Sequence, residues 1–312
     1  MRIRFEKCLF VLAGVIGFVL AVDLLLAGIK PSPIKSSDDL QKIRQTLSKL
    51  KPIHKKLGKP EPGEWLAQHP EQGQTFLQYN RSRPVRFTAK RDKLYIQPLG
   101  NFSKQQKELV KSSSEYLACY FDCPVKILEA ISLKEIPDSA QRIHPRWGDH
   151  QVLTSYVLEQ LLAPNLPPDA AAMLAFSSLD LWPGDNWNFV FGQASLRNRV
   201  GVWSFYRHGK TDGTQDEYRT CLKRTIKVAS HETGHMLSMN HCTAWKCNMQ
   251  GSNSLPESDR HPLHLCPECH AKIMLATGCD PRARFRKLAD YFKKNQMKPE
   301  QEFCQQSLER IK

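Results

Sequence analysis

The sequence predicts an α/β domain with a mixed sheet, on the basis of three observations. From about residue 93 onward, short strand-like stretches alternate with longer helical ones. The alternating, aromatic stretches 188–194 and 200–206 follow each other across the turn-prone residues 196–199. A long helix is then expected at 218–238. Strands separated by helices favour parallel pairing, whereas the late pair should form an antiparallel hairpin.

The other elements of this domain follow in chain order. We expect strands at Leu94–Leu99, Val125–Ile131 and Ala171–Leu181, and helices at Ser103–Tyr120, His150–Leu162, Ala271–Leu275 and Arg282–Asn295. The last of these helices has an apolar face rich in aromatic residues. We expect that face to pack on the domain itself rather than to bind a partner.

The size and charge of the chain exclude few classes of function. Its 312 residues are enough for about two domains and a sizeable core. The formal net charge is +14, but the lysines and arginines are scattered, with no run of five. This pattern indicates a solvated basic surface, so we expect no nucleic-acid partner. We also expect a monomer.

Residues 1–29 have the pattern of an export or anchoring segment. A basic amino terminus precedes an apolar stretch, residues 8–29, that is interrupted only by Asp23. Val19 and Ala21 suit signal-peptidase cleavage, but about 20 apolar residues would also suffice to span a membrane. Both alternatives, a signal peptide and an N-terminal membrane anchor, place the rest of the chain outside the cytoplasm.

Residues 30–90 are expected to form a linker followed by a helical and an extended segment. Ser36 and Ser37 can cap a helix whose apolar residues fall on one stripe, which its own core or a partner helix could cover. Residues 52–90 are rich in proline, glycine, glutamine and charge. We expect this stretch to lie extended over the domain formed by residues 91–312.

A His-Glu-x-x-His motif lies in the predicted helix 218–238. Residues four apart project from one face of a helix, so His231 and His235 can share a metal ion, with Glu232 beside it. Zinc bound by imidazoles lowers the pKa of its bound water to about 7, and a neighbouring carboxylate can take the proton as that water attacks a carbonyl. The motif is therefore typical of a zinc hydrolase.

His241 is the expected third ligand. It lies too far along the chain to remain on the same face of a straight helix, so the chain must turn sharply near Ser238. The spacing resembles that of the metzincins, except that Ser238 replaces a glycine. Glycine suits the left-handed backbone at a helix end, and another residue there costs about 1 kcal/mol or more. We therefore expect the turn to differ in detail.

Four cysteines follow the motif as two short pairs, Cys242 with Cys247 and Cys266 with Cys269. Each pair can hold one side of a tetrahedral zinc ion. A closed four-thiolate site leaves no position for substrate, so we assign it a structural role in fixing the chain after His241. Such sites are usual in reducing compartments, which stands against an exported chain, although zinc-bound thiolates resist oxidation better than free ones. Alternatively, the leader anchors the protein with its domain on the cytoplasmic side, against the charge bias.

Six of the ten cysteines remain outside that site. Cys8 lies in the leader, and the others are Cys119, Cys123, Cys221, Cys279 and Cys304. For the pair that lies four residues apart, 119 and 123, free thiols or a disulfide are favoured over a third metal site.

The complete pattern reads His-Glu-x-x-His-x-x-x-x-x-His-Cys-x-x-x-x-Cys-x-Met, followed by Cys-x-x-Cys. This pattern resembles that of the archaemetzincin family of zinc metallopeptidases. The flanking residues 250–252 and 265–267 are similar as well. The resemblance implies a metzincin-like catalytic domain with an active-site helix and a C-terminal subdomain held by the four-cysteine site. It implies these roles: zinc ligands His231, His235 and His241, general base Glu232, second-zinc ligands Cys242, Cys247, Cys266 and Cys269, and Met249 beneath the active site.

In metzincins the strand lining the cleft runs antiparallel at the sheet edge, and residues 188–194 are the candidate here. An extended peptide could pair with that edge and so orient its scissile bond over the zinc.

Two functions are compatible with these features. The first is a zinc-dependent metallopeptidase with two zinc ions and peptide or protein substrates, for which the resemblance implies aminopeptidase-like cleavage. The alternative is a non-catalytic zinc-stabilised module that binds an anionic partner. That alternative gives no reason for Glu232 between two histidines, and no basic cluster adjoins the cysteines. We therefore favour the peptidase.

Overall fold

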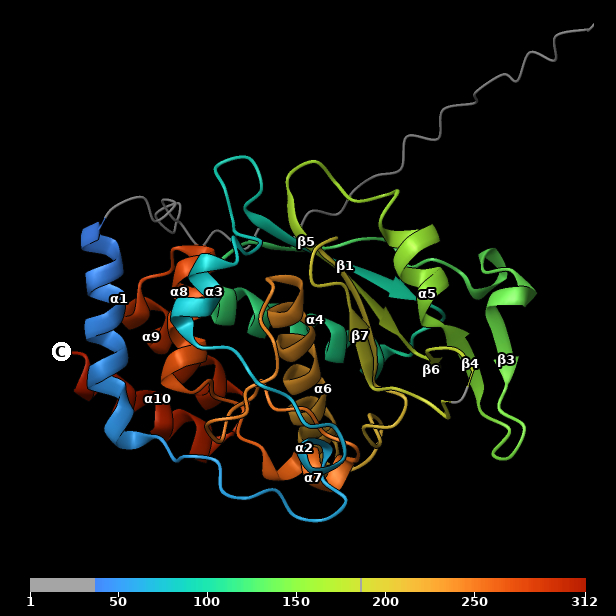
Figure 1. Ribbon diagram of the computed structural model, residues 1–312. Coiled ribbons are helices and arrows are strands. Elements are labelled where there is room, and N and C mark those ends of the chain that lie inside the picture. The colour runs from blue at the N-terminus through green and yellow to red at the C-terminus, as the bar shows by residue number, and fades with distance from the viewer. Residues whose placement is uncertain (1–36, 186) are drawn as a thin grey trace, which may run out of the picture. The chain divides into compact units, whose positions relative to one another are not determined.

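The computed structural model describes residues 37–185 and 187–312 (Figure 1). The predicted leader, residues 1–29, lies outside the described residues. Among the helices of the described part, none combines the length and the apolar character needed to cross a membrane.

A five-stranded mixed sheet forms the centre of the fold, as the sequence predicts. Its strands are β1 (Lys93–Leu99), β2 (Val125–Ile127), β5 (Ala170–Ser177), β7 (Gly192–Ala194) and β8 (Val200–Ser204). They lie in the order β2-β1-β5-β8-β7, and every neighbouring pair is parallel except β7 with β8. The predicted hairpin thus places an antiparallel strand at one edge of the sheet.

A second, three-stranded sheet was not predicted. It consists of β3 (Gln141–Ile143), β4 (His150–Leu153) and β6 (Asp180–Trp182). The helix predicted at 150–162 is therefore wrong in its first turn, because residues 150–153 pair with β3 and β6. Helical structure begins with α5 (Thr154–Tyr156) and continues as a π-helical turn (Val157–Leu162). The strand predicted at 171–181 is also two strands, one in each sheet.

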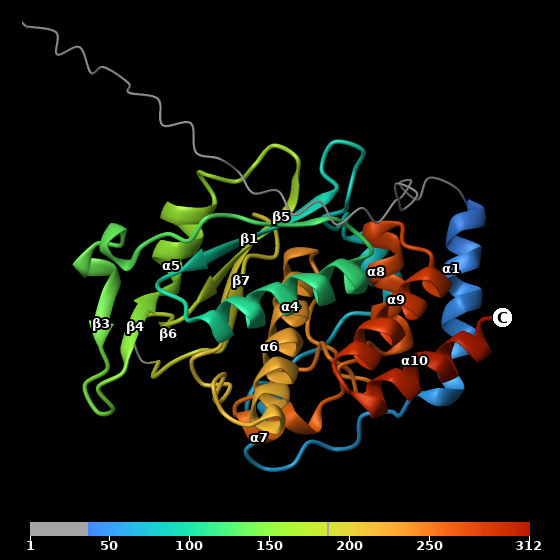
Figure 2. The ribbon, with the colours of Figure 1, turned by 180° about the vertical axis from the view of Figure 1, so that it is seen from behind.

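Helices cover both faces of the large sheet. On one face lie α4 (Lys104–Phe121) and α6 (Gln215–Met236), both predicted, which pack against each other and bury Trp203 and Phe176 (Figure 2). On the other face the turn at 157–162 packs on strand residues such as Met173 and Val202.

The C-terminal residues form four helices beside this core: α7 (Leu255–Arg260), α8 (Pro267–Thr277), α9 (Pro281–Lys294) and α10 (Lys298–Arg310). The apolar face of α9 is buried within the chain, as predicted. The N-terminal helix α1 (Ser37–Leu50) packs against α8, so its apolar stripe is covered by the chain's own core. Shorter elements are α2 (Trp65–Gln68), α3 (Phe76–Arg81) and the 3₁₀ turns Lys51–Ile53, Leu133–Glu135 and Asp138–Ala140.

Candidate metal centre and substrate cleft

The three motif histidines converge. Helix α6 begins with a capping box formed by Thr214 and Glu217, and its last two turns carry His231 and His235 on one face. Their Nε2 atoms lie 3.0 Å apart. One ring nitrogen each from these two residues and His241 lie within 4.8 Å of one another.

The donor set fits a metal ion. The Nδ1 atom of His231 lies 2.8 Å from the carbonyl oxygen of Asn248, and that of His235 lies 2.7 Å from the carbonyl oxygen of Met239. A carbonyl only accepts, so each Nδ1 carries the proton and each Nε2 presents a lone pair. Burial lowers the pKa of both imidazoles, that of His235 to about 3. Two neutral rings with facing lone pairs repel each other unless a cation lies between them.

The turn after α6 returns the chain to the metal centre. Ser238 adopts the left-handed conformation, with φ of 66°. The amide of Met239 bonds to the carbonyl of Gly234 and the amide of Ser238 to that of His235, which is the Schellman arrangement. The Ser238 hydroxyl donates to the Leu196 carbonyl at 2.8 Å and accepts from the Val85 amide at 3.1 Å. These bonds offset the strain that a serine suffers where the metzincin pattern has glycine.

The third histidine has a partner that the sequence analysis did not identify. Nδ1 of His241 lies 2.9 and 3.0 Å from the two carboxylate oxygens of Glu71. Glu71 comes from the extended segment predicted at 52–90, where no motif spacing marks it.

Glu232 lies beside the histidines, at the edge of the sheet. It is buried, and burial raises its pKa to about 8. A cation held by the histidines would favour the ionised carboxylate instead. A Cβ at Gly192 of β7 would lie only 2.8 Å from Glu232 Oε1, so the strand can approach this carboxylate because residue 192 has no side chain.

A cleft of about 460 Å³ opens onto this group. Residues 187–193 line it, together with Trp65 and the stretch 250–253. Glu232 is the one carboxylate among the described lining residues.

Met249 lies beneath the motif helix. Its side chain is fully buried, and a Cβ at Gly234 would lie 2.6 Å from the Met249 sulfur. The glycine within the motif therefore allows methionine to pack directly against the helix backbone between the two histidines.

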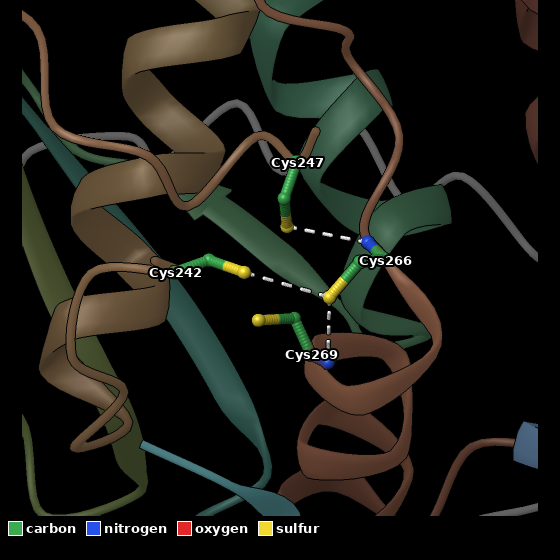
Figure 3. A group of neighbouring side chains, drawn as sticks. All are labelled: Cys242, Cys247, Cys266 and Cys269. Atoms are coloured by element: carbon green, nitrogen blue, oxygen red, sulfur yellow. Dashed lines mark hydrogen bonds between the residues drawn. The ribbon is translucent and has the colours of Figure 1, made fainter. Parts of the chain in front are cut away.

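The four predicted cysteines form a second cluster (Figure 3). All are buried, and the sulfur atoms of Cys242 and Cys266 lie 3.7 Å apart. Main-chain amides of Met249 and Cys266 donate to the Cys247 sulfur at 3.5 and 3.2 Å. Hydrogen bonds from neighbouring thiols lower the pKa of Cys242, whereas burial raises the pKa of Cys247. Four thiolates could coexist here only around a cation, so this donor set also fits a metal ion.

The other described cysteines are free thiols, including Cys119 and Cys123. Cys221 is buried and belongs to neither cluster.

Comparison with known proteins assigns the family. Archaemetzincin-2 of Mus musculus is 34% identical to this chain in an alignment of 259 positions that covers 73% of this chain and 72% of the mouse protein. The chain belongs to the archaemetzincin family. Residues 171–274 match Peptidase family M54. Archaemetzincin-2 of Rattus norvegicus is 35% identical with the same coverage. The solved archaemetzincin (AmzA) from Archaeoglobus fulgidus, complexed with malonate, is 30% identical with a TM-score of 0.45, covering 58% of this chain and 99% of its own.

Membership of the archaemetzincin family confirms the resemblance and makes the chain a zinc metallopeptidase, as the motif predicts. It favours the enzyme over the non-catalytic binding module.

Proposed function

We propose that the chain hydrolyses peptide bonds at the cleft, with zinc bound by His231, His235 and His241 and with Glu232 as general base. The observation that carries this proposal is the convergence of three imidazoles within 4.8 Å beside one buried carboxylate. The left-handed turn at Ser238 and the buried Met249 support a place for the chain among the metzincins.

In this proposal each protein group has a defined task. When bound, zinc supplies a Lewis acid that makes water nucleophilic near neutral pH. The carbonyls of Asn248 and Met239 hold the imidazoles in the tautomer that offers Nε2. The Glu232 carboxylate takes a proton from the attacking water and passes it to the leaving amine nitrogen. Because Glu232 is buried, its carboxylate acts in a region of lower dielectric than water, where its charge has a stronger effect.

We propose that substrate pairs with the free edge of β7. The Ser195 amide donates to Val200 and the Ser204 amide to Phe191 across the hairpin. Hydrogen-bonded pairs alternate along an antiparallel ladder, so Gln193 faces β8 and the backbone groups of Gly192 and Ala194 face outward. An extended peptide on that edge would lie next to Glu232. The amide of Val190 instead donates to the Leu181 carbonyl, so it is not free to bind substrate.

The four-cysteine cluster is proposed to hold a second, structural zinc ion. Cys242 directly follows His241, and Cys266 and Cys269 belong to the start of α8. An ion bound here would link the turn next to His241 to the start of helix α8.

The remaining predictions concern substrate and location. Aminopeptidase-like cleavage would be favoured by a second carboxylate that pairs with a free amino terminus. Glu232 is the one carboxylate of the described cleft lining, so the geometry lends this preference no support. Peptide or protein substrates, a monomer, and an exported or membrane-anchored location stay as predictions.

The test of the proposed base is Glu232→Gln. We expect zinc content to remain at the wild-type value while kcat falls about 10²- to 10⁴-fold, because the amide cannot accept the proton. Zinc content and cleavage of a peptide mixture would be measured together. Asp216→Asn, which changes an exposed carboxylate on the same helix, is the control and should keep both properties. Wild-type turnover in Glu232→Gln would refute the assignment.

A further inference from the structure

The environment of the third histidine differs from that of the other two. His231 and His235 are oriented by main-chain carbonyls, whereas Nδ1 of His241 bonds to the side chain of Glu71, 170 residues earlier in the chain. We propose that Glu71 is a positioning residue of the metal centre, and that residues 65–79, here called the brace, complete that centre. This inference rests on the proposed zinc site.

The chemistry of the contact supports this role. A carboxylate accepts hydrogen bonds and cannot donate them, so Glu71 requires the proton of His241 to be on Nδ1. Nε2 then presents its lone pair to the site shared with the other histidines. A carboxylate behind a ligand imidazole also raises its basicity and fixes the angle of the ring, and loss of such a partner commonly weakens metal binding.

Glu71 is itself held in place. The indole Nε1 of Trp65 donates to Glu71 Oε1 at 2.9 Å, and the Trp65 ring lies edge-on to His241 at 5.4 Å between centroids. Trp65 also packs on Gly251, where a Cβ would lie 2.3 Å from the indole ring. The same residue therefore fixes Glu71 and lines the cleft.

The brace also makes hydrogen bonds to residues before and after Ser238, in the turn that leads to His241. Gln74 donates to the Ser238 carbonyl and accepts from the Asn240 amide, each at 3.3 Å. The Tyr79 hydroxyl donates to the Leu237 carbonyl at 2.7 Å. Gly73, with φ of 67°, lies so close to the chain after Cys242 that a Cβ would clash with Thr243.

The opposite side of the brace is tied to helix α8. The fully buried Lys272 donates to the Gln74 carbonyl at 2.5 Å. Glu268, which lies between two clustered cysteines, accepts from the Phe76 amide at 2.9 Å. The brace is thus held by the turn after α6 and by helix α8, which carry ligands of the two clusters. Glu71 therefore contacts His241 before substrate binds.

The experiment measures zinc affinity by competition with a chromophoric chelator, without use of activity. In Glu71→Ala we expect the affinity of the histidine site to fall about 10- to 100-fold. Glu71→Gln keeps an acceptor but loses the charge, so its loss should be smaller. Glu61→Gln, an exposed carboxylate upstream of the brace, is the matched control and should bind as wild type does. Affinity within twofold of wild type in Glu71→Ala would overturn the inference.

His235→Ala separates this inference from the proposed function. If that variant keeps every zinc ion of the wild type, the proposed metal site fails and the inference fails with it. If it loses one ion while Glu71→Ala binds normally, only the inference fails.

Adding Glu71→Gln to His235→Ala tests for a purely structural role. We expect no change in melting temperature, because no ion remains at the histidine site for Glu71 to position. A fall as large as that caused by Glu71→Gln in the wild-type background would assign Glu71 to folding and contradict the inference.

Discussion

At the scale of single residues, the metal centre combines side chains of one motif with contacts from remote parts of the chain. The convergence of His231, His235 and His241 and that of the four cysteines follow from spacing along a helix and a short loop. Ser238 adopts the left-handed turn despite its side chain, because its hydroxyl finds two partners that no local rule could supply. Glu71 lies in a stretch without periodicity, so only the folded chain reveals its contact with His241.

Gly192 offers a test at this scale. Gly192→Ala places a methyl group within 2.8 Å of the Glu232 carboxylate and must displace it. We expect kcat to fall about 10- to 100-fold, since small displacements of a catalytic group are costly, with zinc content unchanged. Steady-state kinetics and metal analysis would check this. Unaltered kcat would show that the position of Glu232 is not critical.

At the scale of helices and strands, the long periodic elements were predicted well. The strand at 94–99, the helix at 103–120 and the motif helix agree with the structure to within a few residues. Short strands whose pairing partners lie far away in the sequence were not predicted correctly. Residues 150–153 form a strand because they find β3 and β6, and the apolar stretch 171–181 breaks where the chain passes from one sheet to the other. Periodicity alone contains no information about such partners.

The edge strand gives a prediction at this scale. Ala194→Pro removes an amide that faces the free edge, so we expect KM to rise roughly tenfold through loss of a backbone bond to substrate, with little change in stability. Gln193→Pro removes an amide that faces β8 and should instead lower the free energy of unfolding by about 1–3 kcal/mol. Kinetics and denaturant melts of both variants would check the contrast. An unchanged KM in folded Ala194→Pro would exclude pairing at this edge.

At the scale of the whole molecule, the stretch 52–90 makes more contacts around the candidate active site than its composition suggested. Residues 55–57 bond to 244–246 of the cysteine loop, and the brace holds the turn after α6 and the start of α8. A proline- and glycine-rich stretch gives no sequence signal for such contacts, because each is made by an irregular backbone with a remote partner. The catalytic helix could be recognised from the sequence, but the parts that support its ligands could not.

The most direct test of the account is the number of zinc ions per chain, measured by plasma mass spectrometry on wild type, His235→Ala and Cys269→Ser after gel filtration. We predict two ions in wild type and one in each folded variant, with peptide cleavage retained by the Cys269→Ser protein that still holds its histidine-bound ion. A wild type with a single ion, or a His235→Ala protein that keeps both, would contradict the central claim that two separate donor sets bind metal.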